Sequence, residues 1–515
     1  MMKHLRRLSQ GLFLLLFLWL FLKTESTGAD ELAYPVRIFL DADPLLFFTT
    51  ALATRSLDQP FLWVLIVVVV TALLGRVFCG WICPLGTLHN LVGALKRGPV
   101  RSRPANGYRY KYYLLVFLGV SSIFTVQLSG IADPLALLVR SLSVSVHPAL
   151  QVATTATFDA IYASFPAGIV GVSEWIYGGL KQIFLAFRQP LFLQSASIGG
   201  LFLGILALNL REPRFWCKYL CPLGALLGLL SRYALLDRTV SEGCDGCGAC
   251  ARTCQGAARP DGKETWRKAE CLACMNCDDA CPRNAVRFGF SRKKPVASLD
   301  LGKRRVIGSM TAGLLAAPLL RTTPLSRPAA AEPKLIRPPG ALEEKEFLRR
   351  CVKCGECMKV CLTNGLQPTL LEAGIEGIWS PMLVPRIGYC EYRCTLCGQV
   401  CPTGAIRRLS LAEKAEVRIG LAMIDPGRCL PYAHARSCIV CEEVCPTPKK
   451  AIWFETAAVK TRDGQTLRVK QPRVDLELCI GCGICEAKCP VLGEPAITVS
   501  SLGESRSQDR RLLLS

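Results

Sequence analysis

The sequence lacks any constellation of residues typical of nucleophilic or general acid–base catalysis. Along its 515 residues we find no nucleophile set beside a base and no pair of general acids. If the chain is an enzyme, we therefore expect oxidation and reduction rather than hydrolysis or group transfer.

Negative charge is also scarce. The chain has 62 Lys and Arg against 40 Asp and Glu, a formal net charge of +22. Such a charge could indicate nucleic-acid binding. However, the basic residues lie in loops beside apolar segments and near cysteines whose thiolates, when metal-bound, are anionic. We therefore expect no nucleic-acid partner.

Hydrophobic residues make up 51% of the chain and charged residues 20%, with a mean hydropathy of +0.31. A chain of this length has room for about three domains. The two facts together predict one membrane-embedded part and one polar part.

Cysteine is abundant, and 24 of the 28 cysteines form six short runs. Four runs have the spacing C-x2-C-x2-C-x3-C, which is typical of [4Fe–4S] clusters. They are Cys244, Cys247, Cys250, Cys254; Cys271, Cys274, Cys277, Cys281; Cys351, Cys354, Cys357, Cys361; and Cys479, Cys482, Cys485, Cys489. Two looser runs are Cys390, Cys394, Cys397, Cys401, and Cys429, Cys438, Cys441, Cys445.

Zinc and disulfides are the alternatives for these runs. Zinc sites favour two separated cysteine pairs, and cysteines two residues apart rarely form disulfides with each other. Proline follows the last cysteine of several runs, as at Pro282 and Pro490, and a short apolar pair such as Ala285-Val286 comes next. We predict six [4Fe–4S] clusters, with a small strand after several of the runs.

Apolar segments at 11–22, 61–82, 112–131 and 190–210 are candidate membrane helices, the first also a candidate signal peptide. Basic residues crowd 96–111 and follow residue 210, which predicts that both regions are cytoplasmic. The module near 241–290 would then be cytoplasmic too. A further apolar segment, 306–320, follows Lys303-Arg304-Arg305. It is either a fifth helix or a twin-arginine export signal, cleaved near 329–331 or kept as a tether. Either way, the later runs are expected outside.

The remaining cysteines lie in an internal repeat. Asp43-Pro44-Leu45 precedes a segment ending in Cys79-x3-Cys83-Pro84, and Asp133-Pro134-Leu135 precedes one ending in Cys217-x3-Cys221-Pro222. Parallel repeats imply a pseudo-twofold axis along the membrane normal. The axis would bring Cys79, Cys83, Cys217 and Cys221 together as a seventh metal centre. Redox-active disulfides and purely structural cysteines are the alternatives.

Other polar residues of the repeat have two interpretations each. Asp43 and Asp133 can cap the helices that start at the following proline, or they can accept protons from quinol. His89 and His147 can be local hydrogen-bonding groups or quinone ligands.

The first half, with its paired C-x3-C-P-L-G turns, resembles the NapH-type membrane ferredoxins, which are quinol dehydrogenase subunits. The second half resembles NapG/MauM-type ferredoxins in its double arginine and in the string from Gly388 to Ile406. The chain thus looks like two such subunits fused. The resemblance implies that Cys351, Cys354, Cys357 share a cluster with Cys489, and Cys479, Cys482, Cys485 with Cys361. It likewise joins Cys390, Cys394, Cys397 to Cys445 and Cys429, Cys438, Cys441 to Cys401, and it exchanges Cys254 with Cys281.

We therefore expect a multi-domain protein: an α-helical membrane domain of two parallel repeats, plus α+β bacterial-ferredoxin-like dicluster and four-cluster domains. The expected boundaries are 1–235 for four membrane helices and the two turns, 236–295 for the cytoplasmic module, 296–340 for the fifth helix and proline-rich linker, 341–502 for the periplasmic four-cluster domain, and 503–515 for a tail.

The expected function is oxidation of quinol from the quinone pool of a bacterial inner membrane. Electrons would pass through the clusters to a periplasmic c-type cytochrome or terminal reductase. Two alternatives are a maturation factor that supplies electrons to a partner enzyme, and a ferredoxin-like subunit without a quinone site.

Overall fold

The structure is a computed structural model. It describes residues 2–25, 30–32, 37–57, 62–95, 106–185, 189–258, 260, 266–291, 301–322, 334–460 and 466–507. The expected basic residues Lys96, Arg97, Arg101 and Arg103, and most of the proline-rich linker with Ala329–Ala331, lie outside the described residues.

The chain divides into two compact units, each assembled from separate segments. Unit 1 holds Met1–Lys23, Tyr34–Leu142 and Ala196–Leu319, and unit 2 holds Thr24–Ala33, Ser143–Ser195 and Leu320–Ser515.

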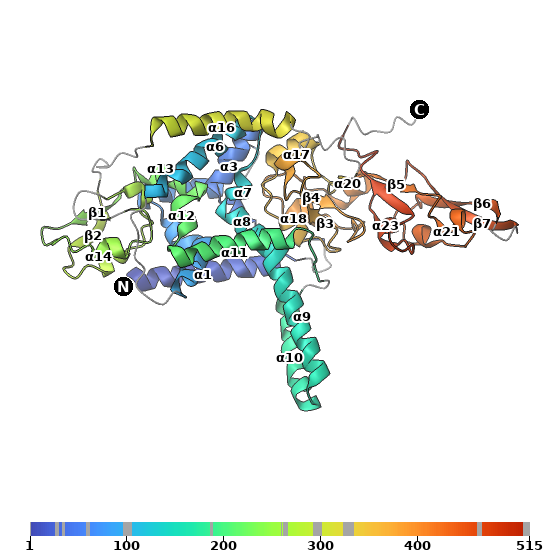
Figure 1. The fold of residues 1–515 in the computed structure, drawn as a ribbon, viewed down its shortest axis with the longest axis horizontal. Coiled ribbons are helices and arrows are strands. Elements are labelled where there is room, and N and C mark those ends of the chain that lie inside the picture. The colour runs from blue at the N-terminus through green and yellow to red at the C-terminus, as the bar shows by residue number, and fades with distance from the viewer. Residues whose placement is uncertain are drawn as a thin grey trace. The chain divides into compact units, whose positions relative to one another are not determined.

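Unit 1 is mostly helical (Figure 1). Its elements are α1 (Met2–Lys23), α2 (Ile38–Asp41), α3 (Pro44–Thr54), α4 (Leu62–Leu74), η1 (Phe78–Ile82), α5 (Pro84–Ala94), η2 (Asn106–Arg109), α6 (Tyr110–Ile123), α7 (Ser129–Ala132), α8 (Pro134–Ser141), α11 (Ser195–Arg211), α12 (Phe215–Tyr219), α13 (Pro222–Ser231), β1 (Leu236–Val240), α14 (Ala249–Arg252), η4 (Lys268–Glu270), α15 (Asn276–Asp279), β2 (Val286–Phe290) and α16 (Lys303–Thr322).

Proline starts the helices of the internal repeat. Asp43 caps α3 and Asp133 caps α8, with proline in the first turn, while α5 and α13 begin at Pro84 and Pro222 directly after a cysteine. A proline in the first turn has a φ angle already suited to the helix. The N–H that it lacks would have had no hydrogen-bond partner within the helix. Helix α13 packs against α4, α6 and α3, which interleaves segments from the two copies of the pattern.

The first cysteine module closes unit 1. Strands β1 and β2 pair antiparallel from Leu236↔Phe290 to Val240↔Val286, and the one-turn helices α14 and α15 lie between them in sequence. Strand β2 starts within the expected Ala285-Val286 pair, and β6 and β8 likewise start at Ile452 and Ile497. After the run of Cys401, however, Ile406 forms an isolated bridge with Ala341.

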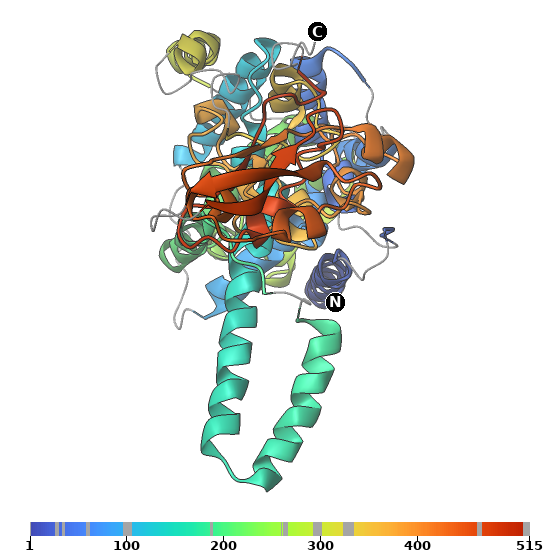
Figure 2. The same ribbon diagram turned by 90° about the vertical axis from the view of Figure 1, so that its right-hand side faces the viewer.

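Unit 2 combines a helical hairpin with small two-stranded sheets. Helices α9 and α10 run antiparallel (Figures 1 and 2). The elements are η3 (Leu142–Val146), whose first residue belongs to unit 1, α9 (His147–Ser164), α10 (Ala167–Ile183), α17 (Glu344–Arg350), α18 (Glu356–Lys359), β3 (Leu366–Pro368), η7 (Ile375–Gly377), β4 (Pro381–Leu383), α19 (Leu396–Gln399), α20 (Leu411–Glu416), β5 (Leu421–Ile424), α21 (Leu430–Ala433), α22 (Val440–Glu443), β6 (Ile452–Lys460), β7 (Thr466–Val474), α23 (Ile484–Lys488) and β8 (Ile497–Ser500). The strand pairs are β3–β4, β5–β8 and β6–β7.

Two helical stretches among the described residues are long and apolar enough to cross a membrane, Met2–Lys23 and Pro134–Ser164. The first was expected and the second was not. The expected segments 61–82, 112–131 and 190–210 contain the shorter helices α4, α6 and α11, and η1 and α7 follow α4 and α6 as separate turns. Segment 306–320 lies within the single helix α16.

Candidate iron–sulfur sites

Each regular cysteine run turns sharply between its second and third cysteines. The residue that caps the one-turn helix there is left-handed: Gly248 (φ 68°), Met275 (φ 56°), Gly355 (φ 84°) or Gly483 (φ 82°). Glycine adopts this conformation without steric cost. The looser runs have Thr395 and Ile439 at that place, with φ of −116° and −122°. The regular and the looser runs thus differ both in cysteine spacing and in the backbone conformation between their second and third cysteines.

None of the 28 cysteines forms a disulfide. Within the described part of the chain, no three His, Cys, Asp or Glu side chains are placed to hold a single metal ion. Free thiols in sets of four are nevertheless suited to a four-iron core, which holds its ligands further apart than one ion does.

In the first module, the last cysteine of the first run lies near cysteines of the second run, as expected. Cys254, the last cysteine of its own run, interacts electrostatically with Cys274, and Cys271 and Cys277 both interact with Cys254. The reciprocal placement of Cys281 with Cys244, Cys247 and Cys250 stays a prediction.

In unit 2, the expected partners of the runs are wrong. Cys401 lies near Cys351, Cys354 and Cys357, where Cys489 was expected. Conversely, Cys361 lies near Cys390, Cys394 and Cys397, where Cys445 was expected. The third and fourth runs of the chain therefore exchange their last cysteines with each other.

The last two runs of the chain form the second exchanging pair. Cys445 lies near Cys479 and Cys482, where Cys361 was expected. Cys489 lies near Cys429 and lines one cavity with Cys429, Cys438 and Cys441, where Cys401 was expected.

Short-range backbone contacts explain this pairing. A Cβ at Gly388 would lie 2.0 Å from the carbonyl oxygen of Thr363, so the chain just before Cys390 passes closely by the chain just after Cys361. In the other pair, β5 joins β8 from Leu421↔Ser500 to Ile424↔Ile497, which carries the segment after Cys489 to the segment before Cys429.

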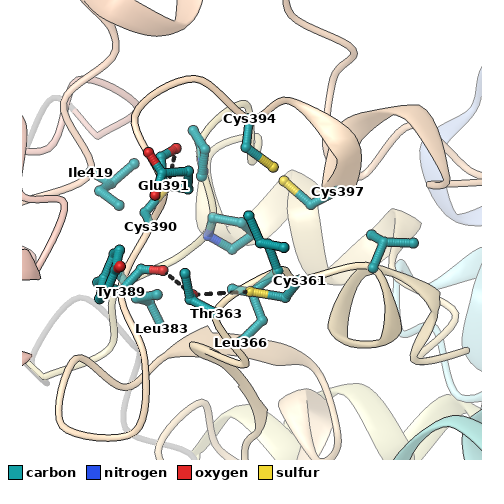
Figure 3. Close-up of a pocket in the computed structure, with 14 residues that line it drawn as sticks. Cys361, Thr363, Leu366, Leu383, Tyr389, Cys390, Glu391, Cys394, Cys397 and Ile419 are labelled. Carbon is teal, nitrogen blue, oxygen red and sulfur yellow. Dashed lines mark hydrogen bonds between the residues drawn. The ribbon is translucent and has the colours of Figure 1, made fainter. Parts of the chain in front are cut away.

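The set of Cys361, Cys390, Cys394 and Cys397 lines a cavity of about 430 Å³, part of it open to solvent (Figure 3). Figure 3 shows the sulfur atoms of Cys394 and Cys397 pointing toward each other. Leu366, Leu383 and Ile419 also line it. Burial raises the pKa of the Cys394 thiol to about 11, so a metal would have to displace a firmly held proton. The donor set and its apolar walls fit a [4Fe–4S] cluster.

The two pairs of runs meet through their backbones. The Cys390 N–H donates to the carbonyl oxygen of Cys482 at 2.8 Å, and the Ile419 N–H donates to that of Ile480 at 3.0 Å. Gly481 has φ 73°, and a Cβ there would lie 2.4 Å from the oxygen of Gly420. The cysteine set of Cys390 is therefore adjacent to that of Cys482.

The four cysteines of the C-x3-C-P turns gather in unit 1. Cys79, Cys83 and Cys217 all interact electrostatically with Cys221, and Cys83 interacts with Cys217. Two buried arginines support them: Arg214 donates to the carbonyl oxygen of Cys79 at 2.9 Å, and an Nη atom of Arg76 lies 4.0 Å from the Cys79 sulfur. The expectation that the two turns meet is consistent with this geometry, and a metal there stays a prediction.

The first of these turns contacts the cysteine module of unit 1. Trp81 donates its indole N–H to the carbonyl oxygen of Ala273 at 2.9 Å. Glu270, which precedes Cys271, is buried with Arg76, Lys111 and Tyr112, and the Tyr112 hydroxyl lies 2.6 Å from its carboxylate. The spacing of the cysteines and apolar segments did not predict this charged cluster. A cation such as Arg76 inside an apolar segment was the signal that could have revealed it.

The histidines act as local hydrogen-bonding groups. His89 Nδ1 lies 2.5 Å from the amide nitrogen of Asn209, and His147 Nε2 lies 3.1 Å from the carbonyl oxygen of Phe184. Asp43 and Asp133 cap α3 and α8, as one of their two interpretations predicted.

Comparison with known proteins supports the iron–sulfur assignment. A family described as a 4Fe-4S binding domain matches residues 60–101 and 196–240, which contain the two C-x3-C-P turns. A second family of the same description matches residues 472–492. No solved structure matches the chain.

Curated relatives match parts of the chain. The methylamine utilization ferredoxin-type protein MauM of Methylorubrum extorquens is 39% identical over 173 residues, 33% of this chain and 74% of that protein. The ferredoxin-type protein NapG of Escherichia coli is 36% identical over 211 residues, 40% and 89% respectively. An uncharacterized protein of Methanocaldococcus jannaschii is 26% identical over 302 residues, 56% and 97%. The chain therefore belongs to the NapG/MauM family of ferredoxin-type iron–sulfur electron-transfer proteins.

Proposed function

We propose that the protein oxidises quinol in a bacterial inner membrane and delivers the electrons to a periplasmic cytochrome or reductase. The observation that carries this proposal is which segments of the chain pack together as unit 2. It joins residues 24–33, 143–195 and 320–515, and the charge pattern predicts the periplasmic side for most of these segments. Unit 1 holds the cysteine module expected in the cytoplasm.

The surface of unit 1 supports a membrane location. Exposed leucine, isoleucine, methionine and tryptophan side chains occur along α1, α4, α11 and α16: Leu12, Leu15, Trp19, Trp63, Ile66, Leu201, Leu203, Ile307, Met310 and Leu314. Soluble monomers rarely expose so much large apolar surface in continuous helices. Helices α16 and α6 also approach closely, since a Cβ at Gly313 would lie 2.8 Å from the oxygen of Phe117. Small residues at such contacts are typical of membrane helices.

The cysteine sets of unit 2 favour a linear electron path. When bound, [4Fe–4S] clusters supply one-electron oxidation and reduction. The set of Cys351 and Cys401 adjoins the set of Cys390 and Cys361 through the exchange of cysteines. The Cys390–Cys482 backbone contact then leads to the set of Cys479 and Cys445, and a second exchange leads to that of Cys429 and Cys489.

In unit 1, Cys79, Cys83, Cys217 and Cys221 would hold a seventh centre beside the module. The contact of Trp81 with Ala273 brings the first turn within reach of the set of Cys271, Cys274, Cys277 and Cys254. We propose that this arrangement links quinol oxidation to the module of unit 1.

The test is reduction of the purified, cluster-loaded chain by a soluble quinol analogue, followed by visible absorbance. Quinol should bleach the clusters, and Cys221→Ser should abolish the bleaching while dithionite still reduces the protein. The exposed variant Ser241→Ala is the control and should behave as wild type. Clusters that stay oxidised at every quinol concentration would remove quinol as the donor.

A further inference from the structure

Two carboxyl groups face each other inside unit 1. Asp43 and Asp133 each have 0% of their surface exposed. In each, Oδ1 accepts two backbone N–H groups: Leu45 and Leu46 at 2.7 and 3.2 Å, and Leu135 and Ala136 at 2.9 and 2.8 Å. Each Oδ2 is buried and has no donor among the described residues apart from the opposite carboxyl group, with which it is within hydrogen-bonding reach.

A hydrogen bond between two carboxyl groups requires a proton on one of them. Two buried carboxylates in contact cannot both ionise, because each raises the cost of charging the other. The pair therefore titrates as a unit rather than as two separate residues.

The surrounding charge favours one proton on the pair. The buried cation Arg140 interacts electrostatically with Asp133. The Arg140 guanidinium is buried and donates to the carbonyl oxygens of Gly130 and Ile131 at 3.0 and 3.3 Å. With one shared proton, the carboxyl pair carries a single negative charge, which Arg140 neutralises. With two protons the carboxyl pair would be neutral and would leave the Arg140 charge uncompensated. With no proton the pair would carry two negative charges against one positive charge. Either state would bury a net charge away from water.

A buried polar network fixes the two chain segments against each other. The Thr49 hydroxyl donates to Ser129 Oγ at 2.8 Å, Gln127 donates to Thr50 Oγ1 at 2.9 Å, and Ser129 donates to Gln127 Oε1 at 2.8 Å. All four residues are 3% exposed or less. The carboxyl pair is thus held in place by contacts that do not depend on its proton.

Helix capping alone does not explain two acids here. Asparagine and serine cap helices as well as aspartate does and need no proton. We propose that Asp43 and Asp133 form a proton-binding site that holds one proton between α3 and α8. This inference goes beyond the proposed function, because the site would bind its proton whatever the electron donor is.

The test is infrared spectroscopy of the full-length, cluster-loaded protein at neutral pH in H₂O and D₂O. The wild type minus Asp43→Asn difference spectrum should show one protonated-carboxyl C=O band that shifts in D₂O. Asp133→Asn should remove the same band, because the asparagine amide can donate to the remaining carboxylate in place of the proton. The exposed Asp159→Asn variant is the matched control and should leave the band intact.

Both asparagine variants keep a capping side chain, and wild-type iron content will show that they fold. A band that survives in both variants, or its absence from the wild type, would overturn the proton site. The outcome is separable from quinol oxidation, since a protein with the band but no quinol activity would contradict the proposed function alone.

Discussion

At the scale of single residues, Glu344 links the segment around Arg337 to Arg506, which is far away in the sequence of unit 2. It accepts from Arg337 at 2.6 and 3.1 Å and from Arg506 at 3.0 Å. Burial alone would raise the pKa of Glu344, but the two arginines outweigh it and lower the pKa to about 2. The stabilisation is therefore complete above the ordinary glutamate pKa near 4.3 and is lost as the pH falls toward 2.

Glu344→Gln should lower the free energy of unfolding at neutral pH by about 3 kcal/mol, because it leaves two arginines beside a neutral group. The difference from wild type should shrink as the pH falls toward 2. Thermal unfolding followed by far-UV circular dichroism at each pH measures it, because the sulfide of iron–sulfur clusters is acid-labile and cluster absorbance is lost at low pH in any variant. Glu346→Gln on the same helix is the control, since its partly exposed pairs with Arg349 and Arg350 are worth under about 1 kcal/mol. An equal loss in both variants would contradict this account.

The exchange of cysteines can be tested by counting iron in double variants. Cys401 and Cys354 belong to one set, so Cys354→Ser with Cys401→Ser should lose one cluster. Cys394 and Cys401 belong to one run but to different sets, so Cys394→Ser with Cys401→Ser should lose two. Iron and sulfide analysis of reconstituted protein gives the counts. The reverse result would mean that each run holds its own cluster.

At the scale of elements, the sequence predicted the parts that depend on local chemistry. The helix starts at Pro44 and Pro134 follow from the position of proline directly after a capping aspartate. The partners of Cys361 and Cys401 did not follow, because they depend on the close passage of Gly388 past Thr363. The apolar segments also did not predict where α4 and α6 end. Neighbouring helices bury the polar groups at these ends, so a helix can stop inside an apolar segment.

The close contact between η1 and the cysteine module of unit 1 can be tested by substitution. A Cβ at Gly80 would lie 2.1 Å from the carbonyl oxygen of Leu272. Gly80→Ala should therefore push the segment of Cys271 away from the turn and slow electron transfer between them, as measured by the rate of cluster reduction. Gly93→Ala is the matched control, because its Cβ would meet nothing within 4 Å. Equal rates in the two variants would mean that this contact does not set the path.

At the scale of the whole molecule, the segments of unit 2 are tied together by direct contacts. Lys359 pairs with Glu25 at 3.0 Å, and the side chain of Asn364 donates to the carbonyl oxygen of Leu191 at 2.7 Å. A membrane cannot separate segments that share such bonds. If the protein spans a membrane as proposed, we expect the hairpin of α9 and α10 to lie on the same side as the four cysteine runs that follow residue 340.

Protease sites inserted singly should report this topology. A site at the exposed Phe165–Pro166 turn and one at Leu502–Gly503 should both be cut in right-side-out vesicles and protected in inverted ones. A site at Ser241–Glu242, beside the first cysteine module, should show the opposite pattern, because the charge rule puts that module in the cytoplasm. Cutting at Phe165 and Leu502 from opposite faces would contradict the shared unit. Cutting at all three from one face would contradict a path that crosses the membrane, since the cysteine sets of both units would then lie on the same side.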